Sequence, residues 1–192
     1  GGEGSNDGYL PETSLPVTVA DRVLNMYEVE PGDLVITEVM YDPSVSVGDE
    51  SDNEWFEIYN NSIYTIDLDG IRVGDESSST GAMSETLELA AGEYAVLARG
   101  NGSGWGYSFT PDGYYGSSPA FNNSGDVVRI FMVEDVIIDQ TANYGSLGGD
   151  GVSISLAEGK DATDNDDIDN WCESTASIGG DFGTPGAGAA CE

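Results

Sequence analysis

The sequence predicts an all-β fold of the sandwich type, and three observations support this prediction. Several short stretches alternate apolar and polar side chains with a period of two, which is typical of strands with one buried face. No segment shows the 3.6-residue periodicity of a helix. Turn signals that end in glycine recur at Asp69-Gly70, Asn101-Gly102, Asp112-Gly113 and Asp150-Gly151. Short strands joined by frequent turns favour a sandwich over any helical fold.

The N-terminal residues 1–32 are predicted to form an extension, and residues 33–192 are predicted to form the main domain. Residues 1–8 are rich in glycine and polar side chains and are expected to be a flexible leader. The segment 15–30 is apolar and prone to form a strand, with candidate pairing residues Leu15, Val17, Val19 and Val23. Two interpretations stay open: the segment is an edge strand of its own sheet, or it pairs with the edge of another subunit.

The most informative strand of the main domain is the stretch 53–60, which reads Asn-Glu-Trp-Phe-Glu-Ile-Tyr-Asn. It alternates large apolar side chains with carboxylates, so we expect Phe56 and Ile58 to face the core and the other face to be in contact with water. The same reasoning places the strands of the domain near residues 34–40, 54–60, 64–73, 85–89, 93–99, 126–133, 135–141 and 151–157.

Two loops are longer than a simple sandwich needs. The first, residues 100–119, mixes aromatic side chains with glycine and serine, and the second runs from residue 159 to residue 180. The aromatic loop is either packed over the sandwich or a recognition surface, because Tyr and Trp give a large contact area at a low cost in entropy. As a recognition surface it would use Trp105, Tyr107, Tyr114 and Tyr115.

The order of motifs resembles that of the bacterial lamin-tail domain family. The motifs are the apolar strand 33–43, an acidic loop, Glu54-Trp55-Phe56-Glu57-Ile58-Tyr59-Asn60, Asp67-Leu68-Asp69-Gly70, and later pieces at 92–100, 121–130, 136–139 and 183–187. The resemblance covers roughly residues 33 to 190. It implies an immunoglobulin-like β-sandwich of the lamin-tail type, here with an N-terminal strand-like extension and long acidic and aromatic loops. It also implies a secreted or surface-attached binding module with no shared catalytic residues.

The charge of the chain excludes several classes of partner. Thirty-six acidic residues against five basic ones give a formal net charge of −31. Such a polyanion cannot neutralise phosphates, which excludes nucleic acid and anionic membrane surfaces as partners. Self-repulsion at this charge favours a medium that contains salt or divalent cations.

Cys172 and Cys191 are the only cysteines, and both lie near the C-terminal end. An even, sparse count of this kind predicts one disulfide and an oxidising compartment. No apolar run approaches the length of a membrane span, so membrane insertion is not expected. These observations predict an extracellular or cell-surface location.

Catalysis is not expected, because the common nucleophile and base pairs are missing. The chain has no histidine, both cysteines are predicted to be paired, and the one lysine, Lys160, lies in an acidic loop that would raise its pKa. With 36 acidic residues, a pair of carboxylates at a suitable separation would occur by chance.

Calcium is the predicted cofactor, because hard cations prefer several oxygen ligands on short loops. The candidate ligands lie in two acidic stretches and are Asp42, Asp49, Asp52, Glu54, Asp161, Asp164, Asn165, Asp167 and Asp169. Asn165, Asp167 and Asp169 match positions 1, 3 and 5 of a calcium loop, but positions 6 and 12 are Asn170 and Ala176, which excludes an EF-hand. The alternative for each stretch is a solvated acidic loop.

Two functional hypotheses follow from the sequence. The first is a non-enzymatic extracellular structural or surface protein that self-assembles through its N-terminal extension and is stabilised by calcium. The alternative is a monomeric adhesion or ligand-binding module that binds another surface protein or a glycan through the aromatic loop 100–119.

Overall fold

The computed structural model describes residues 22–77, 80–83, 86–132, 135–145 and 147–188. The short 3-10 helices η2 (Glu50–Asp52) and η4 (Ile168–Asn170) accompany the strands. The strands are β1 (Val23–Leu24), β2 (Leu34–Met40), β3 (Trp55–Asn60), β4 (Thr65–Asp67), β5 (Arg72–Gly74), β6 (Thr80–Ala82), β7 (Glu88–Leu89), β8 (Tyr94–Ala98), β9 (Gly113–Tyr114), β10 (Arg129–Phe131), β11 (Ile137–Gln140), β12 (Ile154–Leu156) and β13 (Trp171–Glu173).

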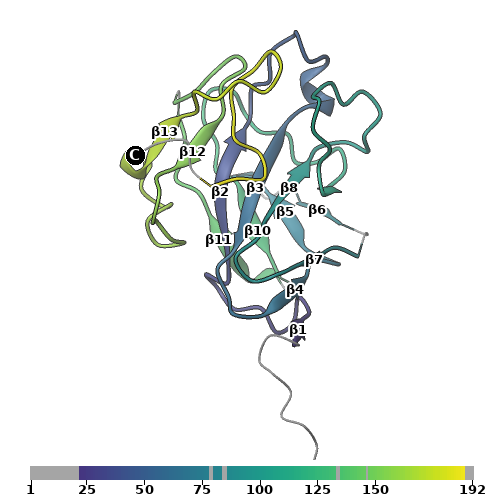
Figure 1. The fold of residues 1–192 in the computed structure, drawn as a ribbon, viewed down its shortest axis with the longest axis vertical. Helices are drawn as coiled ribbons and strands as arrows, with labels where there is room; N and C mark the ends of the chain where they lie inside the picture. Colours follow the sequence, from purple (N-terminus) through teal and green to yellow (C-terminus); the bar gives the residue numbers. More distant parts are fainter. Residues whose placement is uncertain (1–21, 78–79, 84–85, 133–134, 146, 189–192) are drawn as a thin grey trace, which may run out of the picture.

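The strands form two principal sheets and a small third one (Figure 1). The six-stranded sheet has the order β13-β12-β2-β3-β8-β9, the four-stranded sheet has the order β11-β10-β5-β6, and β1-β4-β7 form the third. Neighbouring strands are antiparallel, except that β1 pairs with β4 and β8 pairs with β9 in parallel. This arrangement confirms the predicted immunoglobulin-like β-sandwich. Within the described ranges, no helix has the length and apolar character that crossing a membrane requires.

The main core lies between the sheets and collects inward-facing side chains from all three. Phe56 and Ile58 of β3, which the sequence places in the core, are fully buried there. Val73 and Ile130 come from the four-stranded sheet and Ile66 from the small sheet. Burial of this many apolar side chains is the main driving force for the fold.

The opposite face of β3 corrects the sequence prediction, because most of it is out of contact with water. Trp55 and Glu57 on this face are 0% and 1% exposed. Alternation along a strand separates two faces but does not show whether a second layer covers each of them. Here loops from distant parts of the chain provide that layer.

The observed strands differ from the predicted ones at two glycines, Gly70 and Gly113. The predicted strand 64–73 is broken at Gly70, which has a positive φ of 84°, so its halves β4 and β5 belong to different sheets. Asp112-Gly113 is not a tight turn, since Gly113 begins the short strand β9 beside β8. An added Cβ at Gly113 would lie 2.6 Å from Met83 Cε, so close packing explains this glycine.

The end of the N-terminal extension belongs to the core of its own domain. β1 pairs with β4 of the same chain, and Leu24, Met26 and Val29 are buried in the main core, whereas Val23 is 43% exposed. Strand pairing within the chain is thus seen at Val23 and Leu24, while residues 26–28 form a turn. The other candidate pairing residues, Leu15, Val17 and Val19, lie outside the described residues.

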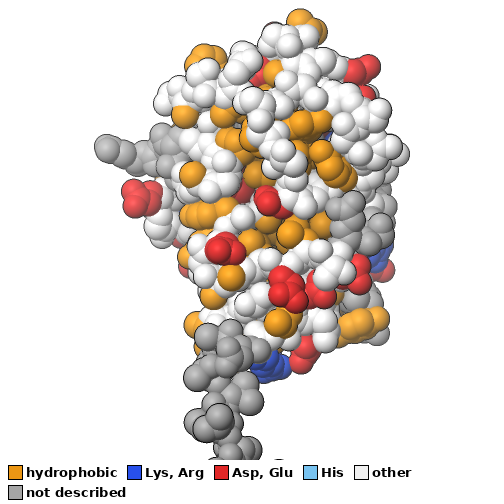
Figure 2. Space-filling view, turned by 45° about the vertical axis from the view of Figure 1, so that its right-hand side comes forward, with side chains coloured by type: hydrophobic (Ala, Val, Ile, Leu, Met, Phe, Trp, Pro, Cys, Tyr) orange, Lys and Arg blue, Asp and Glu red, His pale blue; other side chains and the backbone are white. Residues whose placement is uncertain are grey.

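Acidic side chains lie at many separate places on the face of the molecule drawn in Figure 2. This distribution agrees with the formal net charge of −31. Solvent and salt screen those carboxylates that lie far apart, which reduces their mutual repulsion.

Candidate functional site

The side of the six-stranded sheet that faces away from the main core is called the outer face here. Cross-strand pairing places Glu57 beside Val96 and Tyr59 beside Tyr94 on this face. Its side chains fall into three regions along the strands. The first lies under the aromatic loop, the second lies under the C-terminal segment, and the third lines a cavity.

The aromatic loop packs on the first region and forms a second hydrophobic cluster. The fully buried members of the cluster on the sheet are Met40, Trp55, Val96 and Ala98. Trp105 donates from Nε1 to the Phe109 carbonyl oxygen at 2.7 Å, and the Tyr107 hydroxyl donates to Asp181 Oδ2 at 2.7 Å. Burial, aided by Asp181, raises the pKa of Tyr107 far above its usual value. The loop is therefore a packed layer over the sheet.

The other two aromatic residues predicted to bind a ligand, Tyr114 and Tyr115, differ in how deeply they are buried. Tyr114 lies half-buried in β9 and packs at the edge of Trp105. Tyr115 is 1% exposed and packs in the main core against Phe56 and Phe121. Tyr115 has no surface to offer a ligand, which corrects the sequence prediction for this residue.

The second region is covered by residues 183–188, called the C-terminal strap here, which crosses β2 and β3 (Figure 1). Two buried glutamates of the outer face hold it. Glu38 accepts hydrogen bonds from the Thr184 backbone N–H at 2.8 Å and from its hydroxyl at 2.9 Å. Glu57 accepts from the Gly186 backbone N–H at 2.6 Å. Both glutamates are 1% exposed, so the strap is fastened to the sheet by carboxyl groups out of contact with water.

Neighbouring polar groups complete the surroundings of these two glutamates. Glu38 also accepts from the hydroxyls of Ser153 and Ser174, and Glu57 accepts from Thr37 Oγ1 at 2.8 Å. Burial, together with the charge of Glu38, raises the pKa of Glu57 to about 8. Burial also raises the pKa of Glu38, against the opposing effect of its hydrogen bonds.

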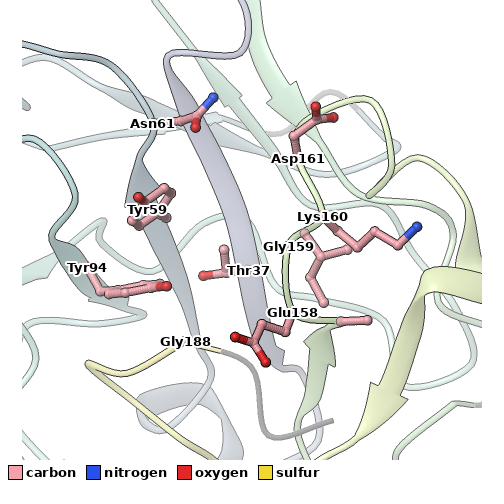
Figure 3. Close-up of a pocket in the computed structure, with 11 residues that line it drawn as sticks. Thr37, Tyr59, Asn61, Tyr94, Glu158, Gly159, Lys160, Asp161 and Gly188 are labelled. Atoms are coloured by element: carbon pink, nitrogen blue, oxygen red, sulfur yellow. The ribbon is translucent and has the colours of Figure 1, made fainter. Parts of the chain in front are cut away.

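The third region is a cavity of about 590 Å³, called the tyrosine pocket here (Figure 3). Its lining residues come from the four strands β2, β3, β8 and β12, from the residue after β3, from the loop after β12 and from the end of the strap. They are Thr37, Tyr59, Asn61, Tyr94, Leu156, Ala157, Glu158, Gly159, Lys160, Asp161 and Gly188.

Rigid strands position one wall of the tyrosine pocket. Tyr59 of β3 and Tyr94 of β8 are directly opposite each other, with ring centroids 4.8 Å apart and ring planes inclined by 41°. On β2 the pairing with β3 shifts between Ile36 and Glu38, so Thr37 is an extra residue of a β-bulge. Bulges of this kind change the direction of a side chain, and this one places Thr37 in the wall of the pocket.

The loop 157–161 provides the opposite wall, where Glu158, Lys160 and Asp161 lie across from the two tyrosines (Figure 3). Lys160 Nζ lies 3.5 Å from Asp164 Oδ1, a long and exposed ion pair that contributes little to stability. The pocket therefore combines two aromatic rings with carboxylate, ammonium, amide and hydroxyl groups.

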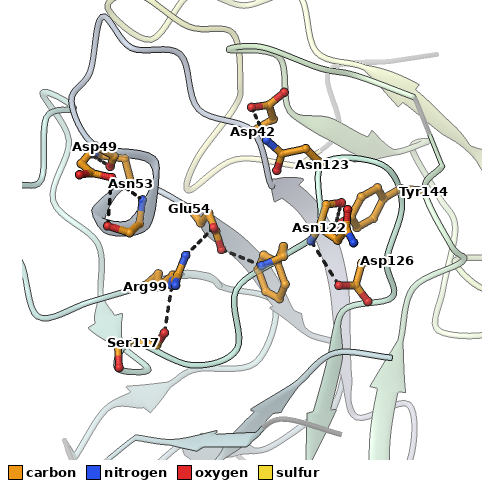
Figure 4. A network of polar contacts seen from close by, with 12 residues as sticks. Asp42, Asp49, Asn53, Glu54, Arg99, Ser117, Asn122, Asn123, Asp126 and Tyr144 are labelled. Carbon is orange, nitrogen blue, oxygen red and sulfur yellow. Dashed lines mark hydrogen bonds and ion pairs between the residues drawn. The ribbon is translucent and has the colours of Figure 1, made fainter. Parts of the chain in front are cut away.

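The residues of the first acidic stretch make separate contacts (Figure 4). Asp42 accepts from Asn123 Nδ2 at 2.8 Å, and Asp49 accepts from the Ser51 backbone N–H at the start of η2. Asp52 Oδ2 lies close to Gly104, where an added Cβ would be 2.7 Å from it.

Glu54, the fourth candidate calcium ligand of this stretch, forms an ion pair with Arg99. Its Oε1 lies 2.7 Å from Arg99 Nη1, with side chains 1% and 15% exposed (Figure 4). Its Oε2 accepts from the Phe121 backbone N–H at 2.9 Å. Burial raises the pKa of Glu54 to about 7, although Arg99 and the Phe121 N–H act in the opposite direction.

The second acidic stretch is organised by local turns and one buried amide. The Asp161 carboxylate accepts from Thr163, and Asp167 caps η4 by accepting from the Asp169 backbone N–H. Asn165 is 0% exposed, and its Nδ2 donates to the Ile36 carbonyl oxygen and to Asp139.

The described residues contain no group of three or more Asp, Glu, His or Cys arranged to hold a metal ion. The calcium site therefore stays a prediction. The same holds for the disulfide: Cys172 lies half-buried in β13 and is not a free thiol, but Cys191 lies outside the described residues.

Sequence reasoning missed the residues that organise the outer face, namely Glu38, Glu57, Tyr59 and Tyr94. Their position on one face follows from strand alternation once the pairing of β2, β3 and β8 is known. The pairing register has no local signal in the sequence, so this surface becomes visible only in the structure.

Comparison with known proteins agrees with the fold. No curated protein matches the chain. The model of the lamin tail domain family matches residues 29–146, which include β2 to β11. The match ends before β12, β13 and the C-terminal strap, so one wall of the tyrosine pocket comes from the matched residues and the other from the segment that follows them. Because the match spans more than half of the 192 residues, this chain belongs to the lamin tail domain family.

Proposed function

We propose that this protein is a non-catalytic, extracellular binding module whose ligand occupies the tyrosine pocket. Lamin tail domains are immunoglobulin-like structural and interaction modules and are generally non-catalytic. The observation that carries the proposal is the arrangement of the outer face. The aromatic loop and the strap cover two of its regions, and the third is a cavity of about 590 Å³ with two half-buried tyrosines in its wall.

The geometry favours binding in this cavity over recognition by the aromatic loop. The rings of the loop pack against the sheet and against one another, whereas Tyr59 and Tyr94 contribute ring surface to an open cavity. Cavities of about 300–1,000 Å³ with a few convergent polar groups are typical of small-molecule sites. Side chains on paired strands also hold their positions without a large loss of entropy on binding.

The N-terminal segment supports a binding module over a self-assembling one. β1 is already paired with β4, and Leu24 and Met26 are already buried in the core of the same domain. Residues 23–29 would have to leave these contacts before they could pair with another subunit. An extracellular location is supported by the net charge of −31 and by the sparse, even cysteine count.

A saturation-transfer NMR screen tests this proposal with four classes of probe: neutral oligosaccharides, dipeptides, free amino acids and nucleosides. We expect at least one class to give signals with the wild-type protein. The double variant Tyr59→Ala/Tyr94→Ala is expected to lose these signals, because it removes the aromatic wall. Tyr27→Ala is the matched control, since Tyr27 is 74% exposed and lies outside the pocket.

Two results would contradict the proposal. One is the absence of signals from all four classes with the wild-type protein. The other is a set of signals that the double variant retains in full, which would place the bound probe elsewhere on the molecule. Urea unfolding of the double variant shows whether it remains folded during the screen.

A further inference from the structure

We infer that the tyrosine pocket binds a neutral carbohydrate, presented as a short oligosaccharide. This inference rests on the proposed function and specifies its ligand class. Four features of the pocket support it: the aromatic wall, the mixture of hydrogen-bonding groups, the excess of negative charge and the small apolar lining.

The aromatic wall fits the C–H faces of a sugar ring. Tyr59 and Tyr94 are half-buried, so part of each ring is free for contact while the rest is packed. Aromatic faces carry negative electrostatic potential and attract polarised C–H groups, and they lose little rotamer entropy on binding. Their inclination of 41° gives the wall a bent surface, to which a puckered ring fits better than a flat nucleobase.

The polar groups of the pocket suit a ligand that carries many hydroxyls. Each hydroxyl both donates and accepts, so its site needs both kinds of group. The Glu158 carboxylate points toward the two tyrosines and can accept, the Tyr59 hydroxyl can donate, and Lys160 Nζ points away from the rings (Figure 3). Asn61 donates from Nδ2 to the Gly32 carbonyl oxygen, and its amide oxygen is an additional acceptor. Glu158 and Asn61 are exposed, so hydrogen bonds to a ligand would replace those to water.

Charge excludes the anionic alternatives. Glu158 and Asp161 outnumber Lys160 in the lining, and the whole chain carries a formal net charge of −31. Uronates, sulfated sugars and phosphorylated ligands would meet a negative potential both on approach and in the pocket. Neutral sugars are not affected in this way.

The small apolar lining disfavours lipids and other apolar ligands. Besides the two tyrosines, Leu156 and Ala157 are the apolar side chains of the lining, and Leu156 is buried beneath the surface. A ligand that relied on the hydrophobic effect would find little apolar area to cover. A cavity of about 590 Å³ is large enough for more than a single small polar molecule, which favours an oligosaccharide.

Isothermal titration calorimetry with the full chain tests the inference. The probes are neutral trisaccharides of glucose, mannose, galactose and N-acetylglucosamine, with trigalacturonic acid as the anionic counterpart. We expect at least one neutral trisaccharide to bind, and trigalacturonic acid to bind at least about tenfold more weakly at low salt.

Pocket variants locate the bound trisaccharide. Tyr94→Ala is expected to weaken binding by about tenfold or more, whereas Tyr94→Phe keeps the ring and stays within about threefold of the wild type. Tyr27→Ala is expected to bind as the wild type does. A Tyr94→Phe variant as weak as Tyr94→Ala would contradict a stacking role for the ring.

The outcomes separate this inference from the proposed function. If no neutral trisaccharide binds while a dipeptide, amino acid or nucleoside does so in a Tyr94-dependent manner, the ligand class is wrong and the pocket remains the binding site. Stronger binding of trigalacturonic acid than of its neutral counterparts would also overturn the inference. If none of these probes binds, both the inference and the proposed function fail.

Discussion

Replacement of Arg99 by methionine is expected to lower the free energy of unfolding by about 2–3 kcal/mol at pH 8, because Glu54 must then either stay charged without a partner or take up a proton. Arg99 is the ion-pair partner of Glu54, a carboxylate that is 1% exposed, at 2.7 Å. Methionine keeps much of the side-chain volume but leaves Glu54 buried beside no positive charge. Arg99 Nε also donates to the Ser117 carbonyl oxygen at 3.1 Å, and this contact would be lost as well. Urea unfolding of the two proteins measures the difference.

A second substitution separates the buried charge from the loss of packing. Glu54→Gln removes the charge but keeps a carbonyl oxygen that can accept from the Phe121 N–H. The double variant Arg99→Met/Glu54→Gln is therefore expected to recover at least about half of the lost stability. A loss below about 1 kcal/mol for Arg99→Met would show that the pair behaves as a solvated surface ion pair.

Stability is expected to decrease as the pH rises from 5 to 8.5, by about 2–5 kcal/mol. Burial raises the pKa of Glu57 to about 8 and those of Glu54 and Asp139 to about 7, and it also raises the pKa of Glu38. In the unfolded chain these carboxyl groups titrate near 4.3 or below. Between the two pKa values the folded protein binds more protons than the unfolded chain does, so raising the pH favours unfolding.

Urea unfolding across this pH range checks the prediction, and two controls assign its cause. Glu57→Gln removes a group whose pKa of about 8 lies above those of Glu54 and Asp139, and it should flatten the pH dependence above pH 7. Added salt at about 1 M screens repulsion between surface carboxylates but acts much less on buried groups, so most of the dependence should persist. Stability that rises between pH 5 and 8.5 would show that these carboxyl groups are ionised and well solvated in the folded protein.

The parts of the fold that depend on local patterns could be predicted from the sequence. The strand expected at 34–40 has the bounds of β2, and Phe56 and Ile58 are in the core as predicted. Period-two alternation and turn residues act over a few neighbouring positions, so one sequence is enough to read them. These local patterns could not show that other segments of the chain cover Trp55 and Glu57.

The organisation of the outer face depends on contacts between distant residues, which leave no local signal. Glu38 and Thr184 are 146 positions apart, and Tyr107 and Asp181 are 74 positions apart. The tertiary fold brings these residues together, because neither pair is close in the sequence. The tyrosine pocket depends in addition on one extra residue at Thr37, which shifts the register of β2 against β3.

The Asn165 side chain has a structural contact that its sequence pattern does not indicate. Its spacing to Asp167 and Asp169 imitates the start of a calcium loop, yet its side chain is fully buried and joins the loop to Asp139 and to the backbone of Ile36. Buried polar groups need hydrogen-bond partners, and an asparagine can meet this need for two segments at once. The spacing of side chains therefore did not reveal which of them turn inward.

Hydroxyl-radical footprinting with peptide mass spectrometry tests most directly whether the outer face is closed except at the tyrosine pocket. Radical attack on an aromatic side chain requires contact with solvent. We expect Tyr59 and Tyr94 to be oxidised, while Trp55 and Tyr107, which are 0% and 7% exposed, stay protected. Oxidation of Trp55 and Tyr107 as fast as that of the exposed Tyr27 would contradict the cover formed by the aromatic loop and, with it, the assignment of the pocket as the open part of the outer face.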